Sequence, residues 1–137
     1  MAAKDAAMVS RILNSTTSAT AFTTLTAGFL VRLNSTASTP AASGTQIASG
    51  NGYVTGGQTS TAPFASTSAA GSAVTLPHTA ILTWTCALGG GWSIVSLDLT
   101  DGAGVRTWFG NFNGQPIAVA NGNTFQIAVD AIVISDT

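Results

Sequence analysis

The sequence predicts an all-β protein: a single β-sandwich of jelly-roll-like type, with one short helix at its N-terminus. Thr is the most frequent residue from Thr16 onward, and Val and Ile recur in the apolar runs; the branched Cβ atoms of these three residue types fit a pleated sheet better than a helix. Short apolar runs are separated by Gly, Pro and Asn turn signals at roughly 8–12-residue spacing, which is the pattern of a sandwich or barrel. A chain of 137 residues is expected to form one domain, residues 1–137.

The helix is expected over residues 1–14. This segment has no Gly or Pro and is rich in Ala, and its larger apolar residues fall at helical spacing, namely Met8, Val9, Ile12 and Leu13. So short a helix is not stable alone in water. Its apolar stripe must therefore pack on its own domain, which we favour, or on a neighbouring subunit.

The first half of the chain predicts one strand and then a long irregular region. Phe29, Val31 and Leu33 occupy alternate positions, as in a strand that is buried on one face. Residues 34–73 are rich in Ser, Thr and Gly. We interpret them as a long loop, or as an arm that lies across a neighbouring subunit. The large side chain of Tyr53 needs burial, which argues against a flexible linker.

The second half predicts a hairpin and a final pair of strands. Apolar and polar residues alternate in Trp92–Thr100, the turn Asp101–Gly104 follows, and Val105–Phe112 is the return strand. We expect the polar residues of the first strand to face solvent. The apolar pattern shifts phase at Asp130–Ala131, which predicts a bulge or a change of sheet. The predicted core consists of Val95, Leu97, Leu99, Phe125, Ile127 and Val129.

The charge content is far below that of an ordinary soluble domain. Only 7% of the residues are Asp, Glu, Lys or Arg, against about 25% usually. A free monomer with so neutral a surface tends to associate, so we expect a homo-oligomer. The basic residues form no cluster that would bind nucleic acid. No apolar run approaches the ~20 residues of a membrane helix, and the N-terminus does not resemble a secretory signal, so assembly in the cytoplasm is expected.

No constellation of catalytic, cofactor-binding or metal-ligating residues is evident, and we expect a protein that is not an enzyme and needs no cofactor. His78 has no Cys or carboxylate at ligand spacing and is interpreted as structural. Cys86 lies in an apolar run, which predicts burial. Asp98 and Asp101 could form a carboxylate pair, but a solvated strand face and a turn residue explain them better.

Aromatic residues are the remaining candidates for a binding surface. The candidate interface or ligand aromatics are Tyr53, Trp84, Trp92, Trp108 and Phe112. Their rings could stack on a sugar, as in a carbohydrate-binding module, or could pack in the core and at contacts between subunits. Core and interface packing is the favoured interpretation, because it needs no additional ligand.

Five segments follow one another in a suggestive order: Leu33–Pro40, Gly50–Tyr53, Trp92–Gly104, Asn121–Asn123 and Phe125–Ser135. They correspond to a strand end with a Pro-containing loop, a Gly-Tyr motif, a Trp-led strand, an Asn-Gly turn and a final apolar strand pair. In this order they resemble the small structural proteins of tailed phages that infect Gram-positive and actinobacterial hosts. Members of that family are labelled head decoration or tail fibre proteins.

The resemblance implies a virion structural protein, with no catalytic residues to transfer. Together with the low charge and the long region 34–73, it leads us to expect a capsid decoration (cement) protein. Such a protein would form a homotrimer or similar ring and would stabilise the head by packing against the major capsid protein. The alternative is a tail-tip or tail-fibre position, with tail proteins as partners and a glycan as a candidate ligand.

Overall fold

The computed structural model describes residues 2–4, 29–59, 73–76, 81–113, 116–128 and 131–135. Regular secondary structure in these ranges consists of β-strands, which confirms the all-β class for this part of the chain. The strands are β1 (Ala2–Lys4), β2 (Leu30–Asn34), β3 (Gln58–Thr59), β4 (Ala73–Leu76), β5 (Leu82–Thr85), β6 (Trp92–Ile94), β7 (Ser96–Thr100), β8 (Arg106–Asn111), β9 (Ile117–Val119), β10 (Thr124–Ile127) and β11 (Ile132–Ser135).

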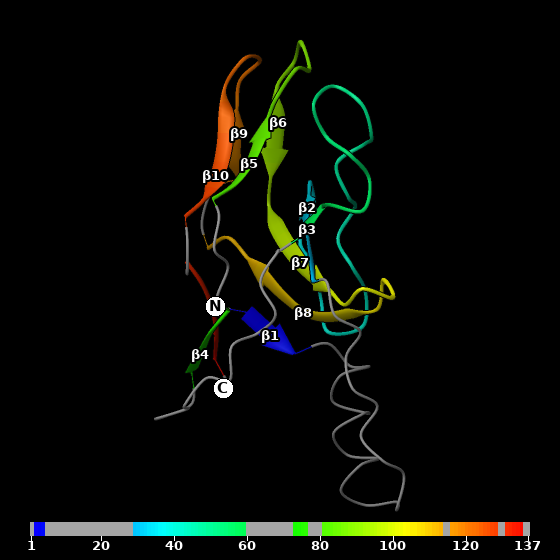
Figure 1. The fold of residues 1–137 in the computed structure, drawn as a ribbon. Coiled ribbons are helices and arrows are strands. Elements are labelled where there is room, and N and C mark those ends of the chain that lie inside the picture. The colour runs from blue at the N-terminus through cyan, green and yellow to red at the C-terminus, as the bar shows by residue number, and fades with distance from the viewer. Residues whose placement is uncertain are drawn as a thin grey trace, which may run out of the picture.

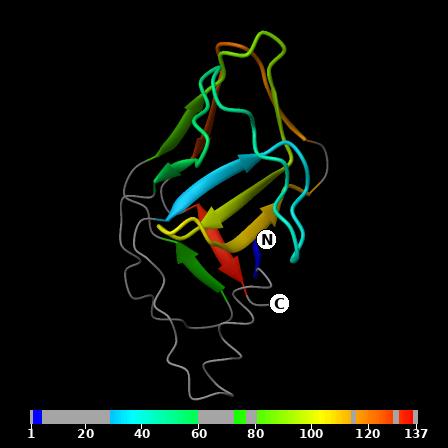
Figure 2. The same ribbon diagram turned by 90° about the vertical axis from the view of Figure 1, so that its right-hand side faces the viewer.

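The strands form one large sheet and two small ones. The large sheet has seven strands in the order β3-β2-β7-β8-β1-β11-β4, and the small sheets pair β10 with β5 and β6 with β9. In Figure 1 the two small sheets form the upper part of the molecule, and β7, β8, β1 and β4 lie below them. In the turned view of Figure 2, β2, β7 and β8 run side by side.

The pairing of β4 to β11 is nested. β7 pairs with β8, β6 with β9, β5 with β10 and β4 with β11, and every pair is antiparallel. The chain therefore forms one long hairpin whose tip is the β7–β8 turn. That turn is specified locally, because Asp101 Oδ1 accepts the N–H groups of Ala103 at 3.0 Å and Val105 at 2.9 Å. Gly104 supplies the positive φ, +82°, that the turn requires.

The predicted helix over residues 1–14 is wrong at its start. Ala2–Lys4 form strand β1, which is antiparallel to β8 and parallel to β11, and residues 5–14 lie outside the described residues. The intrinsic helix preference of an Ala-rich segment is weak over three residues. Here two neighbouring strands supply the backbone partners instead, which is information that the local sequence does not contain.

The strand predicted around Phe29–Leu33 is confirmed as β2. Phe29, Val31 and Leu33 are all buried, so one face of β2 contributes to the core as the alternation predicts. Val31 pairs with Leu99 and Leu33 with Leu97 of β7. Consequently β2 extends the apolar face of the neighbouring strand.

The described part of the region 34–73 folds back onto its own sheet. Ser35 N–H donates to the carbonyl of Thr45 at 2.8 Å, and Ile47 N–H donates to the carbonyl of Leu33 at 3.0 Å. The Tyr53 hydroxyl accepts the Leu33 N–H at 3.0 Å, so this buried ring also satisfies a backbone donor. Residues 35–57 therefore form a loop that packs on its own sheet and leads into β3, and residues 60–72 lie outside the described residues.

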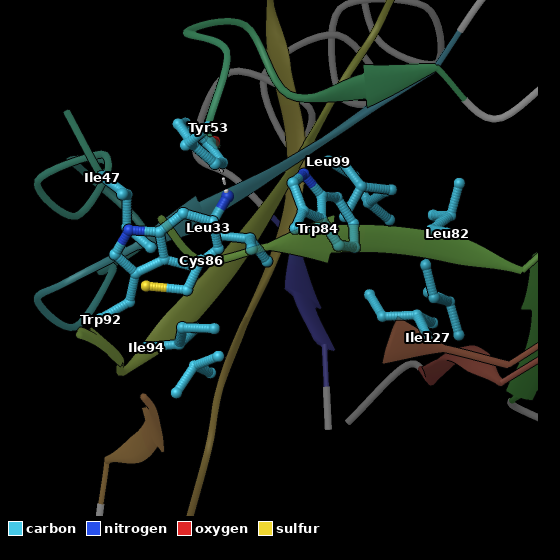
Figure 3. Close-up of a cluster of buried hydrophobic side chains, with 13 residues drawn as sticks. Leu33, Ile47, Tyr53, Leu82, Trp84, Cys86, Trp92, Ile94, Leu99 and Ile127 are labelled. Atoms are coloured by element: carbon cyan, nitrogen blue, oxygen red, sulfur yellow. Dashed lines mark hydrogen bonds between the residues drawn. The ribbon is translucent and has the colours of Figure 1, made fainter. Parts of the chain in front are cut away.

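The hydrophobic core lies between the large sheet and the two small ones. Figure 3 shows Trp92, Cys86 and Ile47 at one end of the cluster and Leu82 and Ile127 at the other. Each small sheet contributes an apolar face, and the large sheet contributes the apolar side chains of β2 and β7. The core is thus closed by strands that are far apart in the sequence.

The predicted core residues have different outcomes. Leu99 and Ile127 are buried, as predicted, and Leu97 and Phe125 are half-buried and pack against the cluster. Val95 is half-buried because it lies at the break between β6 and β7, where the predicted continuous strand Trp92–Thr100 divides. Val129 lies outside the described residues. The predicted change of sheet after β10 is confirmed, since β10 belongs to a small sheet and β11 to the large one.

Candidate functional site

The polar face of β7 is buried, and the prediction that it faces solvent is wrong. Ser96, Asp98 and Thr100 have at most 1% of their surface exposed. The packed loop after β2 contacts this face: Ser38 donates to Asp98, and Ser96 donates to the carbonyl of Thr36 at 2.8 Å. Alternation reports which residues share a face, but it does not report what covers that face.

Asp98 and Ser38 form the centre of the buried polar cluster. The Ser38 hydroxyl donates to Asp98 Oδ1 at 2.7 Å and accepts the backbone N–H of Gly44 at 2.8 Å. Asn34 Nδ2 donates to the same hydroxyl at 3.2 Å and to the Ser96 hydroxyl at 3.1 Å. A short bond from a hydroxyl to an ionised carboxylate is among the stronger hydrogen bonds in proteins. It fixes the loop to β7.

Arg106 of β8 connects the same carboxylate to the loop backbone. Its Nη1 lies 3.8 Å from Asp98 Oδ1, and its Nη2 donates to the carbonyls of Thr39 at 2.7 Å and Pro40 at 3.2 Å. The guanidinium also lies over the ring of Phe109, 5.1 Å from the ring centre. Two opposite charges are thus buried together, with hydrogen bonds that offset part of their desolvation.

Asn111 completes the attachment of the loop. Its amide donates to the carbonyl of Ser38 and accepts the N–H of Ser38, both at 2.9 Å, in the manner of a neighbouring strand. Gly44 packs so closely that an added Cβ would overlap the carbonyl of Thr36. Ser38 is 2% exposed, and its hydroxyl is hydrogen-bonded to Asp98 and to the N–H of Gly44. It therefore holds the loop in place and does not present a nucleophile to solvent.

Asp98 and Asp101 have separate hydrogen-bond partners. Asp98 is bonded to Ser38, whereas Asp101 accepts the N–H groups of its own turn, which confirms its predicted turn role. Among the residues that the structure describes, no group of three or more His, Cys, Asp or Glu side chains could hold a metal. Cys86 is fully buried, as predicted, and His78 lies outside the described residues.

The five candidate aromatics divide into two groups. Tyr53, Trp84 and Trp92 are at most 5% exposed and belong to the core, where Tyr53 and Trp92 meet edge to face with ring centres 6.1 Å apart. Their inward orientation is visible in Figure 3. Trp108 and Phe112 are half-buried and pack against the core from outside. Only these two can contribute to a surface.

One apolar groove lies beside Phe112. It has a volume of about 330 Å³ and lies between β7, β8, β10 and the start of β11, with Leu97, Phe112, Phe125 and Ile132 among its lining residues. The rings of Phe112 and Phe125 meet edge to face with centres 6.2 Å apart. Sequence reasoning assigned Phe125 to the core only, because its alternation gave no sign that β10 leaves one side of this residue open.

The described surface is almost free of charge. Of the charged side chains whose burial the structure describes, Asp98, Asp101 and Arg106 are buried and Arg32 is half-buried, so none of them is fully exposed. Arg32 itself is directed to the backbone, since its Nε donates to the carbonyl of Gly56 at 3.3 Å. The fraction of charged groups at the described surface is therefore even lower than the 7% of the whole sequence.

No helix among the described residues has the length and apolar character needed to cross a membrane.

Comparisons with known proteins do not identify a family or a function for this chain. No protein-family model matches the chain, and neither the search of curated proteins nor the search of solved structures finds a match.

Proposed function

We propose that this protein is a phage virion structural protein, a capsid decoration protein that stabilises the head by packing against other subunits. The observation that carries the proposal is the location of the charges. The described charged side chains are buried or half-buried, and the polar groups that remain at the surface belong largely to Ser, Thr, Asn and Gly. The order of segments that resembles tailed-phage structural proteins supplies the setting.

Neutral polar surfaces favour burial between subunits. A charge that is buried at an interface loses hydration and needs a partner, whereas a hydroxyl or amide is desolvated at a smaller free-energy cost. The cores of protein interfaces are accordingly depleted of charged residues. A surface of this kind on a free monomer would give little electrostatic repulsion between copies. This composition supports the proposed self-association, as a trimer or similar ring, and the proposed contact with the major capsid protein.

We also propose the finer fold class, a jelly-roll-like β-sandwich. The nested antiparallel pairs from β4–β11 inward to β7–β8 have the order of a rolled-up hairpin, in which eight strands are divided between two sheets. This chain departs from a simple roll in two respects. Its nested strands are divided between one large sheet and two small ones. β1 joins β8 to β11 and so connects the tip of the long hairpin to its open end.

A non-enzymatic role is part of the proposal. Its support is that the buried polar cluster is engaged in holding a loop, with Ser38 and Asp98 bonded to each other and to neighbours. A tail-tip or tail-fibre protein that binds glycans is the second candidate. The aromatic rings at the groove favour it, but the amide of Asn111 beside them is already used by the backbone of Ser38. Fewer groups therefore remain for sugar hydroxyls.

Copy number on the particle tests the proposal. Phage particles are to be purified and the protein quantified by mass spectrometry against the major capsid protein. Occupation of a repeated lattice position predicts on the order of hundreds of copies per particle, because closed symmetry repeats each contact. A handful of copies would move the protein to the tail. A stable monomer that never associates with particles would reject both positions.

A glycan array separates the two candidates further. A signal that disappears in Phe112→Ala but persists in Trp108→Ala would favour the tail role, because both residues are half-buried aromatics and only Phe112 lines the groove. The decoration role predicts no signal for the parent protein.

A further inference from the structure

β1 occupies an unusual position for a strand at one end of the chain. It lies inside the seven-stranded sheet, between β8 and β11. Ala2, Ala3 and Lys4 pair in antiparallel register with Gly110, Phe109 and Trp108, and Ala2 pairs in parallel register with Ile134. Among the described strands, no other pairing connects the group β3-β2-β7-β8 with the pair β11-β4. Three residues of backbone thus join two parts of the sheet.

The covalent connection of β1 differs from that of the strands beside it. Residues 5–29 connect β1 to β2, whereas only residues 101–105 connect β7 to β8. A connection as long as residues 5–29 can span at most roughly 80 Å, several times the radius of gyration of about 14 Å expected for a domain of this size. The same connection can therefore deliver β1 to its own sheet or to that of a neighbour.

The bonds that hold β1 are backbone hydrogen bonds to β8 and β11, and they are the same whichever copy supplies the strand. We propose that β1 is an exchangeable strand, and that the space between β8 and β11 accepts Ala2–Lys4 of a second copy in the assembled protein. The proposal deepens the proposed function by naming a contact between copies, but it rests on the strand topology and not on the virion setting.

Concentration decides between the closed and the exchanged form. Within one chain the strand has an effective concentration of roughly millimolar order, which favours closure in dilute solution. When copies are concentrated, as in an oligomer or on a lattice, the β1 strand of a neighbour reaches a similar local concentration. It can then replace the chain's own β1 between β8 and β11. In both forms a copy of β1 covers the edges of β8 and β11, so exchange leaves neither edge open to pairing with unrelated strands.

Disulfide trapping tests the exchange. One copy carries Ala2→Cys and another, distinguishable by mass, carries Gly110→Cys, both in a Cys86→Ala background. Residues directly opposite in an antiparallel pair have Cα atoms about 4.5–5.5 Å apart, which a disulfide can bridge. The two are unfolded and refolded together over a range of protein concentrations and then oxidised. We expect a disulfide between the two chains whose yield rises with concentration.

Three further chains complete the design, each with a single introduced cysteine. Lys4→Cys mixed with Trp108→Cys repeats the test at another register pair, in case Gly110→Cys does not fold. Ala2→Cys mixed with Ser93→Cys, an exposed position on β6, reports collisions between chains. Exchange predicts cross-links in both register pairs well above this control. Cross-links in the two register pairs that do not exceed this control at any protein concentration would overturn the proposal.

Two further measurements separate strand exchange from the decoration role: light scattering of the same samples, which reports association, and binding of the protein to phage particles. If the copies associate but neither register pair cross-links, the contact between copies is another surface, so strand exchange is wrong while the virion role is unaffected. If the pairs cross-link and the protein does not bind phage particles, strand exchange stands and the decoration role is wrong.

Discussion

The two faces of β7 are both buried, but by opposite chemistries. On one face Leu99 is fully buried in the apolar cluster between the sheets. On the other face Asp98, equally buried, is bonded to Ser38 and lies 3.8 Å from Arg106. The apolar face gains free energy from buried contact area, which does not depend on the direction of individual bonds. The polar face depends on every donor finding its acceptor.

This difference explains why the loop over the polar face of β7 needs a particular conformation. The apolar face of β7 is covered by other strands, whereas its polar face is covered by the loop that includes Ser38 and Gly44. The hydrogen bonds of this cover require particular distances and directions. They hold the loop so close that an added Cβ at Gly44 would overlap the carbonyl of Thr36.

The largest effect is expected for Asp98→Ala. It removes the acceptor of Ser38 and leaves the buried guanidinium of Arg106 without this carboxylate. Breaking a buried charge pair from one side costs about 3–5 kcal/mol. Urea unfolding should show a correspondingly lower midpoint, and proteolysis should cleave the loop after β2 before the rest of the chain. Equal stability of variant and parent would mean that the polar face does not hold the loop.

A smaller effect is expected on the apolar face, and it should depend on position. Leu99→Ala should lower the free energy of unfolding by roughly 2–5 kcal/mol, the usual range for a buried Leu. Leu97→Ala is the matched control on the same strand and face. Because Leu97 is half-buried beside the groove, its loss should be clearly smaller in the same urea titration. Equal losses would contradict the difference in burial between the two positions.

The smallest effect is expected for Thr100→Val. Thr100 is buried on the polar face, yet its hydroxyl makes no hydrogen bond with the described residues. Replacing an unpaired buried hydroxyl with a methyl group of similar shape removes a desolvation penalty. The free energy of unfolding should therefore stay within about 1 kcal/mol of the parent or rise slightly. A loss as large as that of Asp98→Ala would show that this hydroxyl has a partner in solution.

Local features of the sequence determined much of the fold. Asp101 and Gly104 specify the β7–β8 turn through their own side-chain and backbone chemistry, and the alternation in Phe29–Leu33 places β2 against the core. The phase shift at Asp130–Ala131 predicted a bulge or a change of sheet, and β10 and β11 do belong to different sheets. These signals could be interpreted because each depends on interactions within a few residues.

Contacts between distant segments were decided by the tertiary structure alone. The alternation around Asp98 is the same whether solvent or a loop covers the polar face, so its burial under the segment that contains Ser38 was not predictable. The Ala-rich start of the chain prefers a helix by local propensity, but Ala2–Lys4 pair with β8 and β11. The groove beside Phe112 exists only because β8 and β10 approach each other. A single sequence records the preferences of each segment, whereas partners far along the chain decide which preference prevails.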